Sequence, residues 1–117
     1  QMAPTTLLEQ VTTTTPTGRD PGIAGHPVKV CEVLAMLDGT SYLERVAVSS
    51  PAAVMKTKKA IAKAFQRQID GCGFSLVEIL SPCPTNWKMG ELQACEWVDE
   101  VMAKHFPLGV MKEVPCS

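Results

Sequence analysis

The chain has 117 residues, of which 45% are hydrophobic and 20% charged, a composition typical of one small globular domain and unlike that of a disordered chain. Its 11 basic and 12 acidic residues leave a formal charge of −1, so no overall field attracts nucleic acid or an anionic membrane. No apolar run approaches the ~20 residues that cross a bilayer, and no leader pattern indicates secretion.

The five cysteines are widely spaced and odd in number, which argues against a disulfide scaffold and indicates a reducing compartment. We therefore predict a cytoplasmic protein. No histidine lies beside a cysteine in sequence, so a self-contained zinc site is not expected. We expect Cys31, Cys72 and Cys95 to be small apolar fillers or surface thiols.

Residues 1–26 are rich in threonine, proline and glycine and show no hydrophobic period, which predicts an irregular loop. The run from Thr12 to Arg19 offers hydroxyl and amide groups to phosphate oxygens, but it lacks the spacing of a phosphate-binding loop. Because Gln1 is not an initiator, we interpret the chain as a piece of a longer protein.

Regular structure is predicted from residue 27 onward. Helical spacing of apolar residues indicates a helix at about 28–37, and β-branched residues indicate a strand at about 42–48. A helix at about 51–70 should begin with Ser50 as N-cap and Pro51 in the first position. The apolar residues expected on its inner face are Val54, Ile61, Ala64, Phe65 and Ile69.

A near-continuous apolar run at 74–80 is typical of a parallel strand covered on both faces. A last helix is expected at about 90–104, with Leu92, Val98, Val101 and Met102 facing inward, whereas the final ten residues carry no clear signal. This order predicts an α/β fold with two parallel strands. Two strands make a small sheet, so the sequence suggests half a domain whose open edge favours self-association.

The stretch "SPCPTNW", residues 81–87, places Cys83 between two prolines just after that strand. Proline restricts its own backbone and that of the preceding residue, so the thiol should be held in a fixed direction. Open α/β sheets bind ligands beyond the carboxyl ends of their strands, which is where Cys83 is expected. Two interpretations stay open: a functional thiolate, and a rigid strand-to-helix turn with Asn86 near the helix cap.

Basic residues gather on the helix expected at 51–70. A solvated outer face explains them better than a phosphate site does, because neighbouring glutamine and aspartate residues dilute the charge. The residues concerned are Lys56, Lys58, Lys59, Lys63 and Arg67.

Several stretches taken together resemble one family over nearly the whole chain. They are "QMAPTTL", "TTTTPTGRD", "VKVCEVLAMLDG", "YLERVAV", "KKAIAKAFQ", "LSPCPTNW" and "FPLGVMK". The family is the thiamine-diphosphate-binding β subunit of the 2-oxoacid:ferredoxin oxidoreductases, and the chain is most similar to the 2-ketoisovalerate and 2-oxoglutarate types.

The resemblance implies that residues 27–117 are the C-terminal part of an α/β thiamine-diphosphate-binding domain and that residues 1–26 adjoin the cofactor site. It implies oxidative decarboxylation of a 2-oxoacid to an acyl-coenzyme A, with electrons passing through an iron–sulfur cluster to ferredoxin. The implied cofactors are thiamine diphosphate, Mg²⁺ and a [4Fe–4S] cluster, and other subunits of the complex are implied partners. Cys83 matches the fourth cluster ligand, the other three being cysteines near the N-terminus of the family's subunit.

The family's cofactor motif and its other cluster cysteines match nothing in this sequence and would precede residue 1. Gln1 corresponds to the end of the cofactor loop and so to the rim of that site. We therefore expect no catalytic residue here, no cofactor bound to the piece alone and no activity in isolation. In isolation, the threonine-rich segment should be loose or docked on a neighbouring copy. The alternative is a non-catalytic α/β binding or interaction module.

Overall fold

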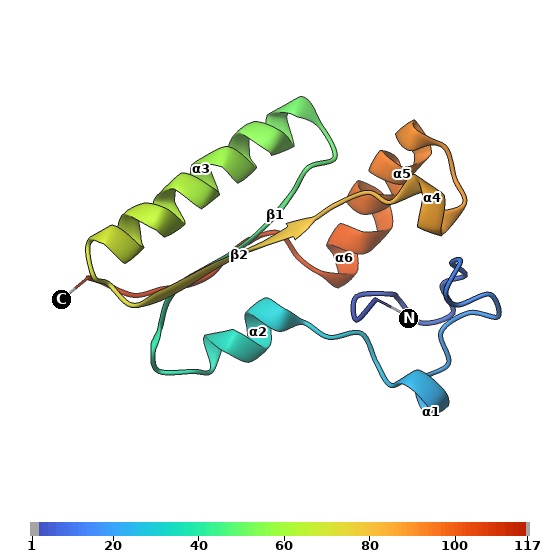
Figure 1. Cartoon of the computed structure of the whole chain (residues 1–117), viewed down its shortest axis with the longest axis horizontal. Helices are drawn as coiled ribbons and strands as arrows, with labels where there is room; N and C mark the ends of the chain where they lie inside the picture. The colour runs from blue at the N-terminus through green and yellow to red at the C-terminus, as the bar shows by residue number, and fades with distance from the viewer. Residues whose placement is uncertain (1–2, 117) are drawn as a thin grey trace.

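The computed structural model of the protein describes residues 3–116, in which helices and strands alternate along the chain (Figure 1). The strands are β1 (Thr40–Ala47), β2 (Phe74–Leu80) and β3 (Gly109–Glu113). The helices are α1 (Pro21–Ala24), α2 (Val30–Ala35), α3 (Pro51–Ile69), α4 (Pro84–Trp87), α5 (Glu91–Trp97) and α6 (Ala103–His105), with the π-helical segment η1 (Val98–Met102) between α5 and α6. The expected α/β class is confirmed. Within this part of the chain, no helix has both the length and the apolar character that a bilayer crossing requires.

The sheet has the order β2-β1-β3, with β1 in the centre. β2 runs parallel to β1, and Val46 lies opposite Ile79. β3 runs antiparallel to β1, and Tyr42 lies opposite Glu113. β3 was not predicted, because this short strand is not strongly apolar and is defined by its hydrogen bonds to β1.

α3 covers one side of the sheet and α2 lies on the other (Figure 1). α3 begins as predicted, since the Ser50 hydroxyl accepts a hydrogen bond from the Ala53 amide at 3.1 Å and Pro51 occupies the first turn. The Thr57 hydroxyl then donates to the carbonyl of Ala47 at 2.9 Å, which ties the helix to β1. After α3, Gly73 has a φ of +116°, a conformation that favours glycine, and an added Cβ would lie 3.2 Å from the Gly39 carbonyl oxygen.

The expected inner face of α3 is only partly correct. Thr57 and Ala60 are the buried residues of α3, whereas Phe65 and Ile69 are 67% and 78% exposed. β2 is one of the two edge strands, and no further strand lies beyond it to cover the rest of the apolar stripe of α3. The expected stripe of the last helix is also only partly buried, because Leu92 and Val101 are exposed.

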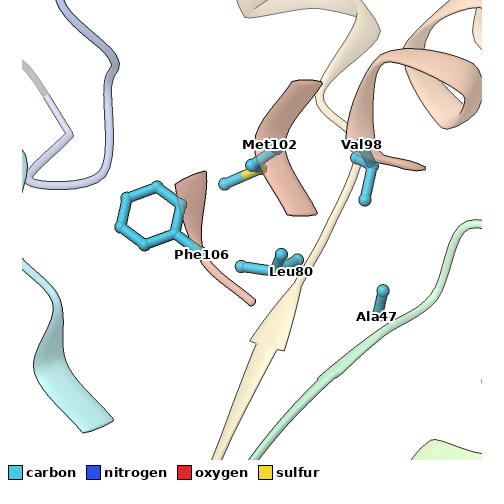
Figure 2. Close-up of a cluster of buried hydrophobic side chains, with 5 residues drawn as sticks. All are labelled: Ala47, Leu80, Val98, Met102 and Phe106. Carbon is cyan, nitrogen blue, oxygen red and sulfur yellow. The ribbon is translucent and has the colours of Figure 1, made fainter. Parts of the chain in front are cut away.

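The hydrophobic core lies at the carboxyl ends of β1 and β2. There the segment formed by α5, η1 and α6 packs its buried side chains against the two strands (Figure 2). This packing fixes the position of the helical segment that follows β2, up to Phe106. The cluster consists of Ala47, Leu80, Val98, Met102 and Phe106.

A buried charge network joins α2 to the sheet. Arg45 on β1 is fully buried, and its guanidinium pairs with Glu32 of α2 at 2.5 Å and with Glu78 of β2 at 2.8 Å. The same guanidinium lies over the ring of Phe106, with 5.4 Å from its central carbon to the ring centroid. Two carboxylates and an aromatic face therefore compensate the buried charge.

The structure corrects one prediction about the cysteines. Cys72, expected to be a filler or a surface thiol, forms a disulfide with Cys116, with 4.8 Å between their Cα atoms. The two residues are 44 positions apart and meet only because the end of α3 and the C-terminal residues lie at the same end of the sheet, so spacing could not reveal the pair. Cys31 is buried as expected, and Cys95 is half-buried and free.

The stability of the fold should fall in acid, partly through Glu32. Hydrogen bonding to Arg45 holds the pKa of Glu32 below its ordinary value. A carboxyl with a lowered folded-state pKa stabilises the fold above its unfolded-state pKa of about 4.3, and this contribution disappears as the pH falls through the folded-state pKa. We expect urea unfolding between about pH 6 and pH 3 to show this loss and Glu32→Gln to show a shallower one. An equally steep loss in Glu32→Gln would assign the acid sensitivity to other carboxyls.

Candidate functional site

The turn after β2 presents Cys83 at the carboxyl edge of the sheet, as the sequence predicted. Cys83 is exposed and is the N-cap residue of α4, with Pro84 in the first helical position. Its carbonyl accepts a hydrogen bond from the Trp87 amide at 3.0 Å. A proline on each side and a short helix behind it thus fix the backbone that carries the thiol.

The threonine-rich loop, residues 3–26, packs against this turn. The amide of Thr13 donates to the carbonyl of Asn86 at 3.0 Å, and the Thr13 hydroxyl donates to the side-chain oxygen of the same asparagine. Thr12 is fully buried, and its hydroxyl is 2.7 Å from that of Thr15. The expectation of a loose segment is therefore wrong, because the loop finds its partners within the chain.

Arg19 organises the same loop from inside. Only 5% of Arg19 is exposed, yet no carboxylate within residues 3–116 forms a salt bridge with it. Its three guanidinium nitrogens instead donate to main-chain carbonyls at 2.8–3.4 Å, which folds residues 3–26 around one side chain. The accepting carbonyls belong to Ala3, Pro4, Thr6, Ala24, Gly25 and His26.

A cavity of about 340 Å³ lies between the loop and the turn. The loop supplies hydroxyl and amide groups to its wall, and the turn supplies the Cys83 thiol, so polar groups from distant parts of the sequence converge there. Its polar lining consists of Thr5, Thr6, Gln10, Glu78, Ser81, Cys83 and Asn86, and the rest of the wall is apolar. This arrangement can hold a polar group beside a thiol.

The capacity of this site for metal rests on one residue. No three histidine, cysteine, aspartate or glutamate side chains gather into a metal site anywhere in residues 3–116. Within this part of the chain, Cys83 therefore has no set of neighbouring side chains that could complete a metal site with it. Burial, together with a hydrogen bond to Glu78, raises the pKa of Cys31 to about 12, which keeps that thiol protonated and unsuited to metal. Gln1, the other predicted site residue, lies outside the described residues.

Sequence reasoning missed the loop residues of the cavity and the role of Arg19. One local signal was available: Gly18, just before Arg19, has a φ of +86°, and an added Cβ would lie 2.9 Å from the Glu9 carbonyl oxygen. A glycine before an arginine in a threonine-rich run is consistent with a tightly folded loop. It does not reveal which turn the loop contacts.

No family model matches the chain, and no solved structure matches it. Among curated proteins it is 45% identical over 108 residues to the ketoisovalerate oxidoreductase subunit VorA of Methanothermobacter thermautotrophicus and 44% identical over 108 residues to the protein of the same name from Methanothermobacter marburgensis. In each case the match covers 92% of this chain but only 23% of the relative. The chain is thus similar, over most of its length, to a segment of a ketoisovalerate oxidoreductase subunit and spans about a quarter of that subunit.

Proposed function

We propose that this chain is a segment of the thiamine-diphosphate-binding subunit of a 2-oxoacid:ferredoxin oxidoreductase that acts on branched-chain 2-oxoacids such as ketoisovalerate. The observation that carries the proposal is the 44–45% identity to the two VorA subunits over 92% of the chain. These relatives are ketoisovalerate oxidoreductase subunits named VorA, and the assignment to the thiamine-binding β subunit is our inference from the motifs that resemble that family. In the intact enzyme the partners are the other subunits, ferredoxin, coenzyme A and the 2-oxoacid.

The proposed role of Cys83 is to ligate an iron–sulfur cluster in the intact subunit. Its exposure at the cavity rim supports this role, because a thiol that must bind a group brought by another part of the protein needs an open side. A cluster bound there would carry single electrons from the substrate toward ferredoxin. The prolines on both sides of Cys83 would keep its sulfur in one position, and the hydroxyl groups of the loop would line the approach.

The threonine-rich loop is proposed to form a wall of the thiamine diphosphate site. Its two hydrogen bonds to Asn86 hold the loop beside the Cys83 turn, which supports a position at the edge of the same site. Gln1 is proposed to lie at the rim of the same site. We expect the chain by itself to show no 2-oxoacid oxidation, which an assay with ferredoxin or a dye acceptor would check.

The proposal is tested by anaerobic iron–sulfide reconstitution of the intact parent subunit, read by visible absorption and iron content. We expect Cys83→Ala to lose the cluster or to hold it weakly. Cys95→Ala is the matched control, because Cys95 is also a free cysteine but does not line the cavity, and it should bind iron as the unchanged subunit does. If Cys83→Ala takes up the same stable four-iron cluster, Cys83 is only part of a rigid turn.

A further inference from the structure

The disulfide between Cys72 and Cys116 lies at the surface, where the chain after β3 meets the turn between α3 and β2 (Figure 1). Cys116 is exposed and Cys72 is half-buried, so small solutes can approach the bond from the Cys116 side. Neither residue belongs to the buried hydrophobic cluster of the fold. Exposed disulfides are the ones that thiols open readily, whereas structural disulfides of secreted proteins resist reduction.

The position of Cys72 is set by the hydrogen bonds that end α3. The Cys72 amide donates to the Arg67 carbonyl at 2.9 Å. The Gly71 amide donates to the Gln68 carbonyl at 3.1 Å, and Gly71 has a φ of +71°. This pattern is the glycine cap that commonly ends a helix. The Cys72 thiol therefore stays at this end of the sheet when its bond to Cys116 is open.

The chain before Cys116 is held to the sheet as far as Val114. The Val114 amide donates to the Ser41 carbonyl at 3.0 Å, and the Val114 carbonyl accepts from the Arg67 guanidinium. In the described part of the chain, the main-chain groups of residues 115 and 116 make no hydrogen bond, so the disulfide is what fastens them. Opening the disulfide would therefore free only this short end. The two thiols would stay near each other, at a high effective concentration that favours closing again.

The cysteine pattern predicts a reducing compartment, whereas the structure contains a disulfide. The two observations agree if the bond opens and closes with the surrounding thiols, because disulfides in reducing compartments are usually transient, catalytic or redox-sensing. Among the described residues, the remaining cysteines Cys31, Cys83 and Cys95 are all free, so this behaviour belongs to one pair.

We propose that Cys72 and Cys116 form a reversible redox switch that a low-molecular-weight disulfide, such as oxidised glutathione, closes. The closed switch fastens the residues after Val114 to the end of α3, and the open switch releases them. This inference is independent of the oxidoreductase assignment, because it uses none of the residues on which that assignment depends.

The chemistry is thiol–disulfide exchange in two steps. The exposed Cys116 thiolate attacks one sulfur of oxidised glutathione, which breaks the glutathione S–S bond and releases one glutathione thiolate. The Cys72 thiolate then attacks the Cys116 sulfur of the mixed disulfide and releases the second. The cysteine pair thus loses two electrons and two protons, and two molecules of reduced glutathione form. An excess of reduced thiol drives the same steps backwards.

The test is equilibration of the full 117-residue chain in buffers with different proportions of reduced and oxidised glutathione, followed by alkylation of free thiols and mass spectrometry of peptides. We expect the bond between Cys72 and Cys116 to close as the oxidised share rises and to open completely in an excess of reduced glutathione. Oxidised and reduced starting protein should reach the same distribution. Amide exchange at Val114 should be at least about tenfold faster in the open state, whereas exchange at Val48 should be equal in both states.

Cys95→Ser is the matched control, because it removes a free cysteine outside the pair and should leave the transition unchanged. Cys116→Ser should show only a mixed disulfide of Cys72 with glutathione, and its Val114 amide should exchange as in the open state in every buffer. A bond that stays closed in an excess of reduced glutathione would be a permanent structural disulfide. A pair that collects only mixed disulfides would mean that the two thiols do not meet, and equal exchange at Val114 in both states would show that the bond fastens nothing. Any of these three results overturns the proposal.

Discussion

Arg45→Ala is expected to destabilise the fold by about 3–5 kcal/mol, because it removes a fully buried side chain and leaves the partly buried Glu32 and Glu78 without their counter-charge. The guanidinium is fully buried and also donates to the Pro107 carbonyl at 3.1 Å, so its loss affects α2, β2 and the segment before β3 together. A loss of this size is a large part of the about 5–15 kcal/mol that holds an average domain together. Urea unfolding followed by circular dichroism would measure it.

The control for Arg45 is an exposed ion pair of the same chain. Lys63 and Glu113 are 2.7 Å apart, but their side chains are 45% and 38% exposed, so Lys63→Ala should cost at most about 1 kcal/mol. A similar loss in the free energy of unfolding for Arg45→Ala and Lys63→Ala would contradict the conclusion that burial makes the Arg45 network strongly stabilising.

Arg19→Ala should release the threonine-rich loop and leave the sheet folded. Removing this guanidinium leaves inward-facing carbonyls without a donor, and each unsatisfied buried group costs about 1–3 kcal/mol. We expect amide hydrogen exchange in the loop to accelerate at least about 100-fold, equivalent to about 3 kcal/mol. The amides to follow are those of Glu9, Thr13 and Val28, which donate to carbonyls in or beside the loop.

Two further measurements make this result specific. Exchange at Val48, whose amide donates to the Leu80 carbonyl at the end of the sheet, should stay as slow as in the unchanged chain. Arg19→Lys should restore only part of the protection, because one ammonium group cannot reach carbonyls around a whole loop. Unchanged loop exchange in Arg19→Ala would mean that the threonines hold the loop without Arg19.

Some of the site could be predicted and some could not. The place of Cys83 followed from local signals, because a strand of apolar residues and two prolines fix where the chain stops and turns. Its neighbours could not be predicted, since Thr13 and Asn86 are 73 positions apart and nothing in either segment specifies the other. The same holds for the lysines of α3. Their spacing was visible, but only the position of α3 on the sheet decided that Lys56, Lys59 and Lys63 line a groove between α3 and β3 and that Lys58 does not.

By itself the sequence determined the α/β order, the two parallel strands, the start of α3 at Ser50 and the position of the proline-framed thiol, because hydrophobic period, capping and proline geometry act over a few residues. Tertiary structure alone decided that Arg19 and Arg45 are buried, that Cys72 meets Cys116 and that β3 joins the sheet. A charged side chain is buried only where enough partners converge to replace water, and here those partners come from segments far apart in the chain.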